Sequence, residues 1–318
     1  MKVLVTGGAG LIGSRVTRDL LARGDEVAVV DNFLTGRLDN LPPHSRLTLV
    51  EDTITDPRAL SAAFESFAPD TVLHCAASYK DGDAWETDIA TNIGGTVNVV
   101  RAARRSGVRR LVYLQTALCY GLSPRQPVTE EHPLSPGGSS YAFSKTGGEL
   151  YLQLSGIDYI AFRLANVYGP GSLTGPMPIF YDRLMQGKPC FVVDSRRDFV
   201  FVGDLSELIL MALDGRGSPG AYNASSGSDY AIKDLYDEMR RAMDLPPDPA
   251  VDVRPRGDTD AFRLLLEPAK VRRDFDWQPT TPLADGMQRL VEWYRRNPPQ
   301  QFYTHLKLEA VEDVTRER

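Results

Sequence analysis

The stretch KVLVTGGAGLIGS (2–14) decides the fold. It begins with KVLVT (2–6), an apolar run typical of a buried strand, and continues with Gly7, Gly10 and Gly13. The tight turn after such a strand needs glycine, and a backbone without Cβ atoms lets a pyrophosphate approach the next helix N-terminus. A glycine triplet alone is a weak signal, but this one follows a strand, opens a helix and lies eighteen residues before Asp31. The stretch therefore predicts a dinucleotide site.

Strand-like runs alternate with helical patterns through the first half of the chain. Val, Ile and Leu dominate these runs without alternating with polar residues, which fits a parallel sheet covered on both faces. We therefore predict an α/β fold with a doubly wound parallel sheet. The expected strands are 2–6, 26–31, 47–50, 71–75, 110–115 and 158–163. The expected helices lie near 14–23, 57–67, 92–106 and 141–154.

This alternation breaks up after about residue 166, where Pro and Gly accumulate in YGPGSLTGPMP (168–178). Helical patterns return near 178–187, 231–243 and 282–296, in a smaller and less regular C-terminal α/β lobe. We predict a dinucleotide-binding domain over 1–166, to which the chain returns around 194–225. The second lobe is expected to consist of 167–193 and 226–318.

The overall composition argues against several classes of protein. The 318 residues are 42% hydrophobic and 25% charged, and a net charge of −6 argues against a nucleic-acid partner. No apolar run is long enough to span a bilayer, and MKVLVTGGAG has no signal-peptide plan. Cys75, Cys119 and Cys190 lack CxxC spacing, which predicts free thiols in a reducing cytoplasm. The four histidines are too scattered for a metal motif, so we predict no metal site.

The acidic residue that ends the second expected strand predicts the identity of the dinucleotide. A carboxylate at Asp31 can accept hydrogen bonds from the adenosine ribose hydroxyls and would repel a 2′-phosphate, which favours NAD over NADP. Asp52, after the third strand, can accept from the adenine amino group or be a plain loop carboxylate. The expected cofactor contacts are Gly7, Gly10, Leu11, Ile12, Gly13, Asp31, Asn32, Asp52, Thr53, Ala76, Tyr141 and Lys145.

A candidate catalytic pair lies in YAFSK (141–145), where Tyr141 and Lys145 are four residues apart and so share one helix face. Tyrosine can act as a base near neutral pH only if its pKa falls, and both a lysine ammonium and the positive nicotinamide ring would lower it. Thr116 adds a hydroxyl at the end of the preceding expected strand. Such spacing also arises by chance, so the prediction that this pair is catalytic depends on Thr116 and on the glycine-rich loop upstream.

With the glycine loop, Thr116 and the YAFSK pair, the chain resembles a known family, the extended short-chain dehydrogenase/reductases, in their nucleotide-sugar epimerase/dehydratase group. The resemblance covers nearly the whole chain and implies a Rossmann fold, bound NAD and a C-terminal lobe that binds a nucleotide sugar. It also implies that Tyr141 is the base, that Lys145 holds Tyr141 and the nicotinamide ribose, and that Thr116 hydrogen-bonds the reacting sugar oxygen. The motifs that match in order are TGGAGLIGS (6–14), DN (31–32), Thr116 with YG (120–121), YAFSK (141–145), RLANVYGPG (163–171), RDFVFVGD (197–204), YNASSG (222–227) and RGD…EPAK…WQP (256–279).

The same resemblance implies a set of substrate contacts. Asn166 and Arg197 match positions that contact the nucleotide diphosphate. Arg254 or Arg256 supplies a second cation, and the spacing around RPRGD (254–258, of which Arg256 is the third residue) leaves open which one does. Lys80, in SYKDGDAW (78–85), is a candidate counter-charge for a uronic acid carboxylate, with a solvated loop lysine as the alternative. The segment between GKP (187–189) and RDF (197–199) is shorter than in the family, so UDP is assumed rather than indicated as the nucleotide.

The stretch LQTALCYG (114–121) predicts the reaction. Relatives that dehydrate a sugar carry Asp-Glu after the Thr, because elimination needs an acid and a base. Ala117 and Leu118 can be neither, and Cys119 is expected to be a packed thiol facing away from Thr116. One hydroxyl and one Tyr suffice for C4 epimerisation.

We therefore predict an NAD-dependent 4-epimerase of a UDP-sugar, with UDP-glucuronate first and UDP-glucose second. The alternatives are a UDP-glucuronate decarboxylase, a 4-ketoreductase or dehydratase, and a catalytically silent NAD-binding regulator. Apolar stripes in VNVVRAA (97–103) and YLQL (151–154), together with the helix pairing of the resembled family, predict a homodimer.

Overall fold

The computed structural model describes residues 1–79, 81–121, 125–256 and 261–299. Seven strands form one sheet in the order β11-β6-β5-β4-β1-β2-β3, and every neighbouring pair is parallel. These strands are β1 (Lys2–Thr6), β2 (Glu26–Asp31), β3 (Leu47–Glu51), β4 (Thr71–His74), β5 (Arg110–Thr116), β6 (Tyr159–Leu164) and β11 (Gly220–Ala224). The predicted doubly wound parallel sheet is thus confirmed.

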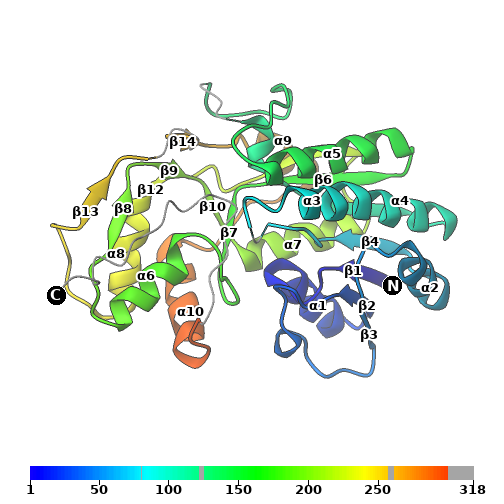
Figure 1. Cartoon of the computed structure of the whole chain (residues 1–318), viewed down its shortest axis with the longest axis horizontal. Helices are drawn as coiled ribbons and strands as arrows, with labels where there is room; N and C mark the ends of the chain where they lie inside the picture. Colours follow the sequence, from blue (N-terminus) through cyan, green and yellow to red (C-terminus); the bar gives the residue numbers. More distant parts are fainter. Residues whose placement is uncertain (80, 122–124, 257–260, 300–318) are drawn as a thin grey trace.

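Helices cover both faces of this sheet (Figure 1). Each face has its own apolar core, because the strands are buried on both sides. One face carries α1 (Leu11–Arg23), α7 (Val202–Leu213) and α9 (Ala269–Phe275). The other face carries α2 (Pro57–Phe67), α3 (Trp85–Asp88), the π-helical segment η2 (Ile89–Gly95), α4 (Thr96–Arg105) and α5 (Ser140–Ser155).

The smaller lobe lies beyond the carboxyl ends of the sheet strands, on the left of Figure 1. A third apolar core joins the helices of this lobe to some of its short strands, which form two strand pairs and one three-stranded sheet. The helices are α6 (Pro176–Met185), α8 (Ile232–Ala242) and α10 (Leu283–Arg296). The short strands are β7 (Asn166–Tyr168), β8 (Phe191–Val193), β9 (Arg196–Arg197), β10 (Phe199–Phe201), β12 (Tyr230–Ala231), β13 (Asp252–Arg254) and β14 (Arg263–Leu264). None of the described helices is both long and apolar enough to cross a bilayer.

One predicted helix differs from the structure at its start. The pattern near 92–106 predicts a helix beginning at residue 92, whereas the chain already winds as α3 and η2 from Trp85. Within η2, the side chain of Asn92 is 1% exposed and bonds the backbone N and O of Ser78 at 2.8 and 2.9 Å. Its Nδ2 also donates to Ser144 Oγ on α5. We attribute the longer helical segment to this inward-facing amide, which the apolar pattern does not reveal.

Candidate active site

The glycine loop between β1 and α1 is held by close backbone contacts. Gly7 has φ +68°, and a Cβ there would lie 2.6 Å from the Ala76 nitrogen. A Cβ on Gly13 would lie 2.2 Å from the Gly7 oxygen, so α1 packs against the loop only because residue 13 has no side chain. Gly10 caps α1 without any side-chain hydrogen bond. The first N–H groups of α1 therefore have no side-chain cap, and the loop fits a bound pyrophosphate.

Asp31 ends β2 beside this loop and is 8% exposed. Its two carboxylate oxygens accept the backbone N–H groups of Ala9 and Phe33, each at 2.8 Å. A carboxylate has about four acceptor positions, so capacity remains for ribose hydroxyls. Asp52 accepts a hydrogen bond from the backbone N–H of Thr53 at 2.7 Å. Asp52 lines the same cavity as Asp31.

A cavity of about 620 Å³ runs from the glycine loop into the smaller lobe. It brings together most of the residues that the sequence singled out. Lys80 lies outside the described residues. The predicted residues that line the cavity are Gly7, Gly10, Leu11, Ile12, Gly13, Asp31, Asn32, Asp52, Thr53, Ala76, Thr116, Tyr141, Lys145, Asn166 and Arg197.

The two candidates for a second diphosphate cation, Arg254 and Arg256, each lie against a phenylalanine ring. The described residues that line the cavity include neither Arg254 nor Arg256. The Arg254 guanidinium is 3.9 Å from the centre of the Phe191 ring and donates to Asp252 at 2.8 Å. The Arg256 guanidinium is 5.8 Å from the Phe262 ring centre. In contrast, Arg183 of α6 lines the cavity, and no motif in the sequence marked it.

The chain changes direction directly after Thr116. β5 ends there, and Ala117–Tyr120 form a 3₁₀ turn, η3. The backbone N–H of Leu118 in this turn donates to Thr116 Oγ1 at 3.2 Å. Ala117 and Leu118 line the cavity, whereas Cys119 is fully buried in the core. Cys119 is therefore a packed thiol, as expected, but the reason differs: it lies on a turn and not on an extended strand.

Lys145 and Tyr141 lie on α5 and line the cavity close to β5. Lys145 is 2% exposed, and its Nζ is 3.9 Å from the centre of the Tyr113 ring. Burial lowers the pKa of Lys145 to about 7. Burial raises the pKa of Tyr141, and the nearby Tyr79 and Asp88 act in the same direction. The pKa of Tyr141 is thus raised in the chain without cofactor, and the expected fall, which depends in part on the positive nicotinamide ring, stays a prediction for the NAD-bound protein.

The predicted diphosphate contacts are fixed by neighbouring backbone. Asn166 Nδ2 donates to the Asp198 carbonyl at 3.1 Å, and Arg197 Nη1 donates to the Arg196 carbonyl at 2.7 Å. Asp198 is 1% exposed and accepts from both the N–H and the hydroxyl of Ser226. The motifs RDFVFVGD and YNASSG, far apart in the sequence, therefore meet through Asp198.

Known proteins share this sequence and architecture. Residues 3–225 match the NAD dependent epimerase/dehydratase family. The chain is 32% identical over 315 residues to a UDP-glucose 4-epimerase of Mycolicibacterium smegmatis, with 93% of this chain and 99% of that protein covered.

Two solved structures from Bordetella bronchiseptica are similar to the whole chain. WbmH in complex with NAD⁺ has 48% identity and a TM-score of 0.89, covering 92% of this chain and 98% of that one. WbmG in complex with NAD and UDP has 39% identity and a TM-score of 0.88, covering 96% and 97%. These findings confirm the family that the sequence motifs predicted and its dependence on NAD. The chain belongs to the NAD-dependent epimerase/dehydratase family.

Proposed function

We propose that this protein is an NAD-dependent 4-epimerase of a UDP-sugar, with UDP-glucuronate as first substrate and UDP-glucose as second. One observation carries the proposal. Thr116, Tyr141 and Lys145 line the same cavity as the glycine loop, and the two positions after Thr116 present only Ala117 and Leu118 to it. Among the described residues, the carboxylates that line this cavity are Asp31 and Asp52, beside the glycine loop. C4 chemistry is thus supported, while an acid/base pair for elimination is missing from the positions that would carry it.

The chain's own groups divide the work at C4. Tyr141 takes the proton of the 4-hydroxyl and returns it after the 4-keto sugar has rotated within the site to present its other face. Thr116 hydrogen-bonds the same oxygen, and Lys145 holds the tyrosine and the cofactor ribose. When bound, NAD⁺ supplies a reversible hydride acceptor and a positive charge. Burial raises the pKa of Tyr141 in the chain alone, and the positive charge of bound NAD⁺ would lower it.

The cofactor is held by the glycine loop, the N-terminus of α1 and Asp31. The carboxylate at the end of β2 disfavours a 2′-phosphate, and NAD that stays bound suits a reaction without net oxidation. WbmG, which is similar over the whole chain, was crystallised with NAD and UDP, and this supports a UDP-linked substrate.

The preference for a uronate rests on the chain around Tyr79. Tyr79 lines the cavity, and its ring meets that of Tyr141 edge-on with centroids 6.4 Å apart. Lys80 follows directly in the sequence and is the proposed counter-charge for the 6-carboxylate. A decarboxylase of UDP-glucuronate would share the oxidation at C4 and is the second candidate.

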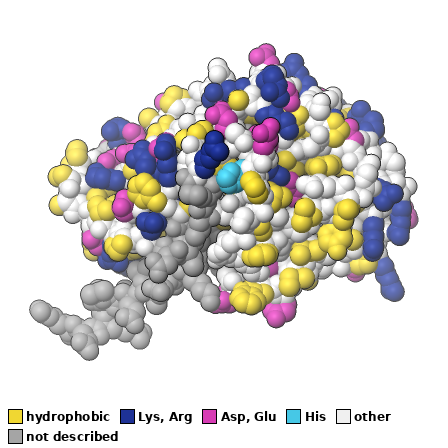
Figure 2. Space-filling model, turned by 90° about the horizontal axis from the view of Figure 1, so that it is seen from above, with side chains coloured by type: hydrophobic (Ala, Val, Ile, Leu, Met, Phe, Trp, Pro, Cys, Tyr) yellow, Lys and Arg dark blue, Asp and Glu magenta, His cyan; other side chains and the backbone are white. Residues whose placement is uncertain are grey.

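We also propose a homodimer formed through α3, η2 and α5. Val99 and Val100 of the stripe in 97–103 are buried within the protomer, so we place the interface on the exposed apolar side chains nearby. Figure 2 shows hydrophobic side chains among the charged ones on the upper face of the molecule. The exposed apolar side chains of these elements are Trp85, Ile89, Phe143, Leu150, Tyr151 and Leu154. A monomer by light scattering at micromolar concentration would contradict this interface.

Incubation with single UDP-sugars, followed by NMR, tests the function. UDP-glucuronate, or otherwise UDP-glucose, should give the galacto epimer at an equilibrium reached from either side. A C4 deuterium should stay at C4, and no deuterium from D₂O should enter C5. Solvent exchange at C5, release of CO₂ or stoichiometric NADH would replace the epimerase with a dehydratase, a decarboxylase or a dehydrogenase.

A further inference from the structure

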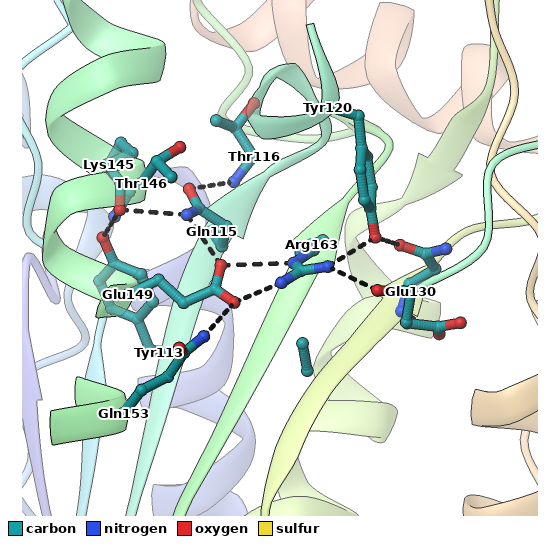
Figure 3. Close-up of polar contacts among 12 residues, drawn as sticks. Tyr113, Gln115, Thr116, Tyr120, Glu130, Lys145, Thr146, Glu149, Gln153 and Arg163 are labelled. Carbon is teal, nitrogen blue, oxygen red and sulfur yellow. Dashed lines mark hydrogen bonds and ion pairs between the residues drawn. The ribbon is translucent and has the colours of Figure 1, made fainter. Parts of the chain in front are cut away.

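A buried ion pair lies next to Gln115, which contacts Thr116 and Lys145 (Figure 3). Glu149 of α5 and Arg163 of β6 are 0% and 4% exposed. Arg163 Nη2 and Nε donate to the two oxygens of Glu149 at 2.6 and 3.3 Å. The described residues that line the cavity include neither of them. Burying two charges costs free energy that attraction often only offsets, so the pair calls for a role other than stability.

Gln115 connects this ion pair to the site. Its Nε2 donates to Glu149 Oε2 and to the Lys145 carbonyl, both at 3.0 Å. Its Oε1 accepts the N–H of Thr116 at 2.8 Å. Both amide protons and the amide oxygen are thus engaged (Figure 3). The Glu149 carboxylate also fixes which way the amide points, since a flipped amide would place its oxygen against a carboxylate and a carbonyl.

Lys145 is held at both its backbone and its side chain. Tyr113 donates its hydroxyl to the Lys145 carbonyl at 2.9 Å, and the Lys145 ammonium is 3.9 Å from the centre of the Tyr113 ring. Tyr113 and Gln115 are two apart on β5 and so share one face of the strand, while Thr116 faces the other way. Two side chains of β5 therefore fix one residue of α5 relative to Thr116.

The other end of the ion pair fixes the turn after Thr116. Arg163 Nη1 donates to the Tyr120 hydroxyl at 2.9 Å and to the Glu130 carbonyl at 3.3 Å. Tyr120 closes the η3 turn and donates in turn to Asn223 Oδ1 at 2.8 Å. The segment from Thr116 to Tyr120 is thus anchored at its start through Gln115 and at its end through Arg163.

We infer that Gln115 is a positioning residue. It is held in place by the Glu149–Arg163 ion pair and in turn fixes the distance between Thr116 and Lys145. The inference rests on the proposed function of Thr116 and Lys145. Gln115 borders the cavity itself, but its polar atoms are all bonded within the chain, so it acts through its neighbours.

The test replaces Gln115 with a side chain of similar length that cannot make these bonds. Gln115→Met removes both donors and the acceptor while keeping the ion pair, whereas Glu149→Gln would leave the buried Arg163 unpaired and threaten the fold. Gln153→Met is the matched control. Gln153 Nε2 donates to the same carboxylate, at 3.5 Å, but from the exposed side of α5 and without contact to Thr116 or Lys145.

In the NAD-loaded enzyme, Gln115→Met should lower kcat roughly tenfold to a hundredfold, because small displacements of reacting groups are costly. The KM for the UDP-sugar and the Kd for NAD should change less than about threefold, since Met fills a similar space at the cavity wall and the glycine loop, Asp31, Asn166 and Arg197 are unchanged. Hydrogen exchange measured by mass spectrometry should speed up in peptides that contain the Thr116 amide. Gln153→Met should match the wild type in kcat and in this exchange.

Two results would overturn the inference. One is a Gln115→Met enzyme with wild-type kcat, and the other is unchanged exchange at Thr116. An equal loss in Gln153→Met would also overturn it, because the effect would then come from Glu149 alone. If the wild type epimerises no UDP-sugar, the proposed function fails, while the exchange measurement still decides whether Gln115 holds Thr116.

Discussion

The two ends of the cavity are built by different means. At the cofactor end the chain offers backbone: glycines without room for a Cβ, and Asp31 held by two N–H groups. At the reaction end it contributes side chains, where the buried Gln115 holds the buried Lys145 and the half-buried Thr116. The first end depends on steric fit within one short motif, while the second depends on polar groups from separate elements. Substitutions at the two ends should therefore have different effects on turnover, stability and NAD binding.

The largest effect should come from removing one oxygen at the reaction end. Tyr141→Phe should lower kcat by at least about a hundredfold, because the hydroxyl carries the proton and the ring only packs. NAD affinity should remain within a few-fold of the wild type, since the cofactor end is intact. Tyr159→Phe makes the same change at a residue that does not line the cavity and should keep full activity. Turnover within tenfold of wild type would remove Tyr141 as the base.

Substitutions at the cofactor end should act through steric clashes. A Cβ on Gly13 would meet the Gly7 oxygen at 2.2 Å, whereas one on Gly10 would meet it at an ordinary 3.4 Å. Gly13→Ala should therefore lower the unfolding free energy of NAD-free protein by roughly 1–3 kcal/mol, as overpacking does, and should also weaken NAD binding. Gly10→Ala should weaken NAD binding while changing that stability by less than about 0.5 kcal/mol. Equal stability loss in both variants, measured by urea unfolding, would contradict this distinction.

This difference also explains what the sequence could predict. The glycine loop and Asp31 are separated by a single helix, so their spacing along the chain already indicates the site. The Gln115–Glu149–Arg163 network joins β5, α5 and β6, and in the sequence its members look like ordinary polar residues of a helix and two strands. The raised pKa of Tyr141 in the chain without cofactor has a related origin: it follows from burial, which the four-residue spacing of Tyr141 and Lys145 does not show. Likewise, only packing reveals Arg183 at the cavity wall.

A third prediction concerns the cost of burying Lys145. Lys145→Met should stabilise the NAD-free protein while it abolishes turnover. The lysine pKa is 10.5 unfolded and about 7 folded, so between these values the unfolded chain binds more protons and stability rises with pH. The penalty is complete below pH 7 and disappears towards pH 10.5. The gain from Lys145→Met should thus be on the order of a few kcal/mol below pH 7 and shrink as pH rises.

The matched control for this prediction is Lys270→Met. Lys270 also places its ammonium over an aromatic ring, 4.1 Å from the centre of Tyr222, but it is only half-buried. It should give no such gain at low pH. Urea unfolding of the three proteins across the pH range measures the comparison, and a gain from Lys145→Met that does not depend on pH would contradict it.

The smallest effect should come from Asp31, where the cofactor end carries its charge. Asp31→Ala should weaken NAD binding by roughly tenfold, as the loss of hydrogen bonds to a charged group does, and should reduce the preference for NAD over NADP. The carboxylate also accepts the N–H groups of Ala9 and Phe33, so part of the loss will come from the loop. NADP titration separates the two contributions, because a loosened loop weakens both dinucleotides while a lost charge favours NADP. Glu51→Ala is the matched control: Glu51 pairs in register with Asp31 and carries the same charge, but does not line the cavity. If both variants keep the wild-type ratio of NAD to NADP affinity, selectivity does not depend on the carboxylate at the end of β2.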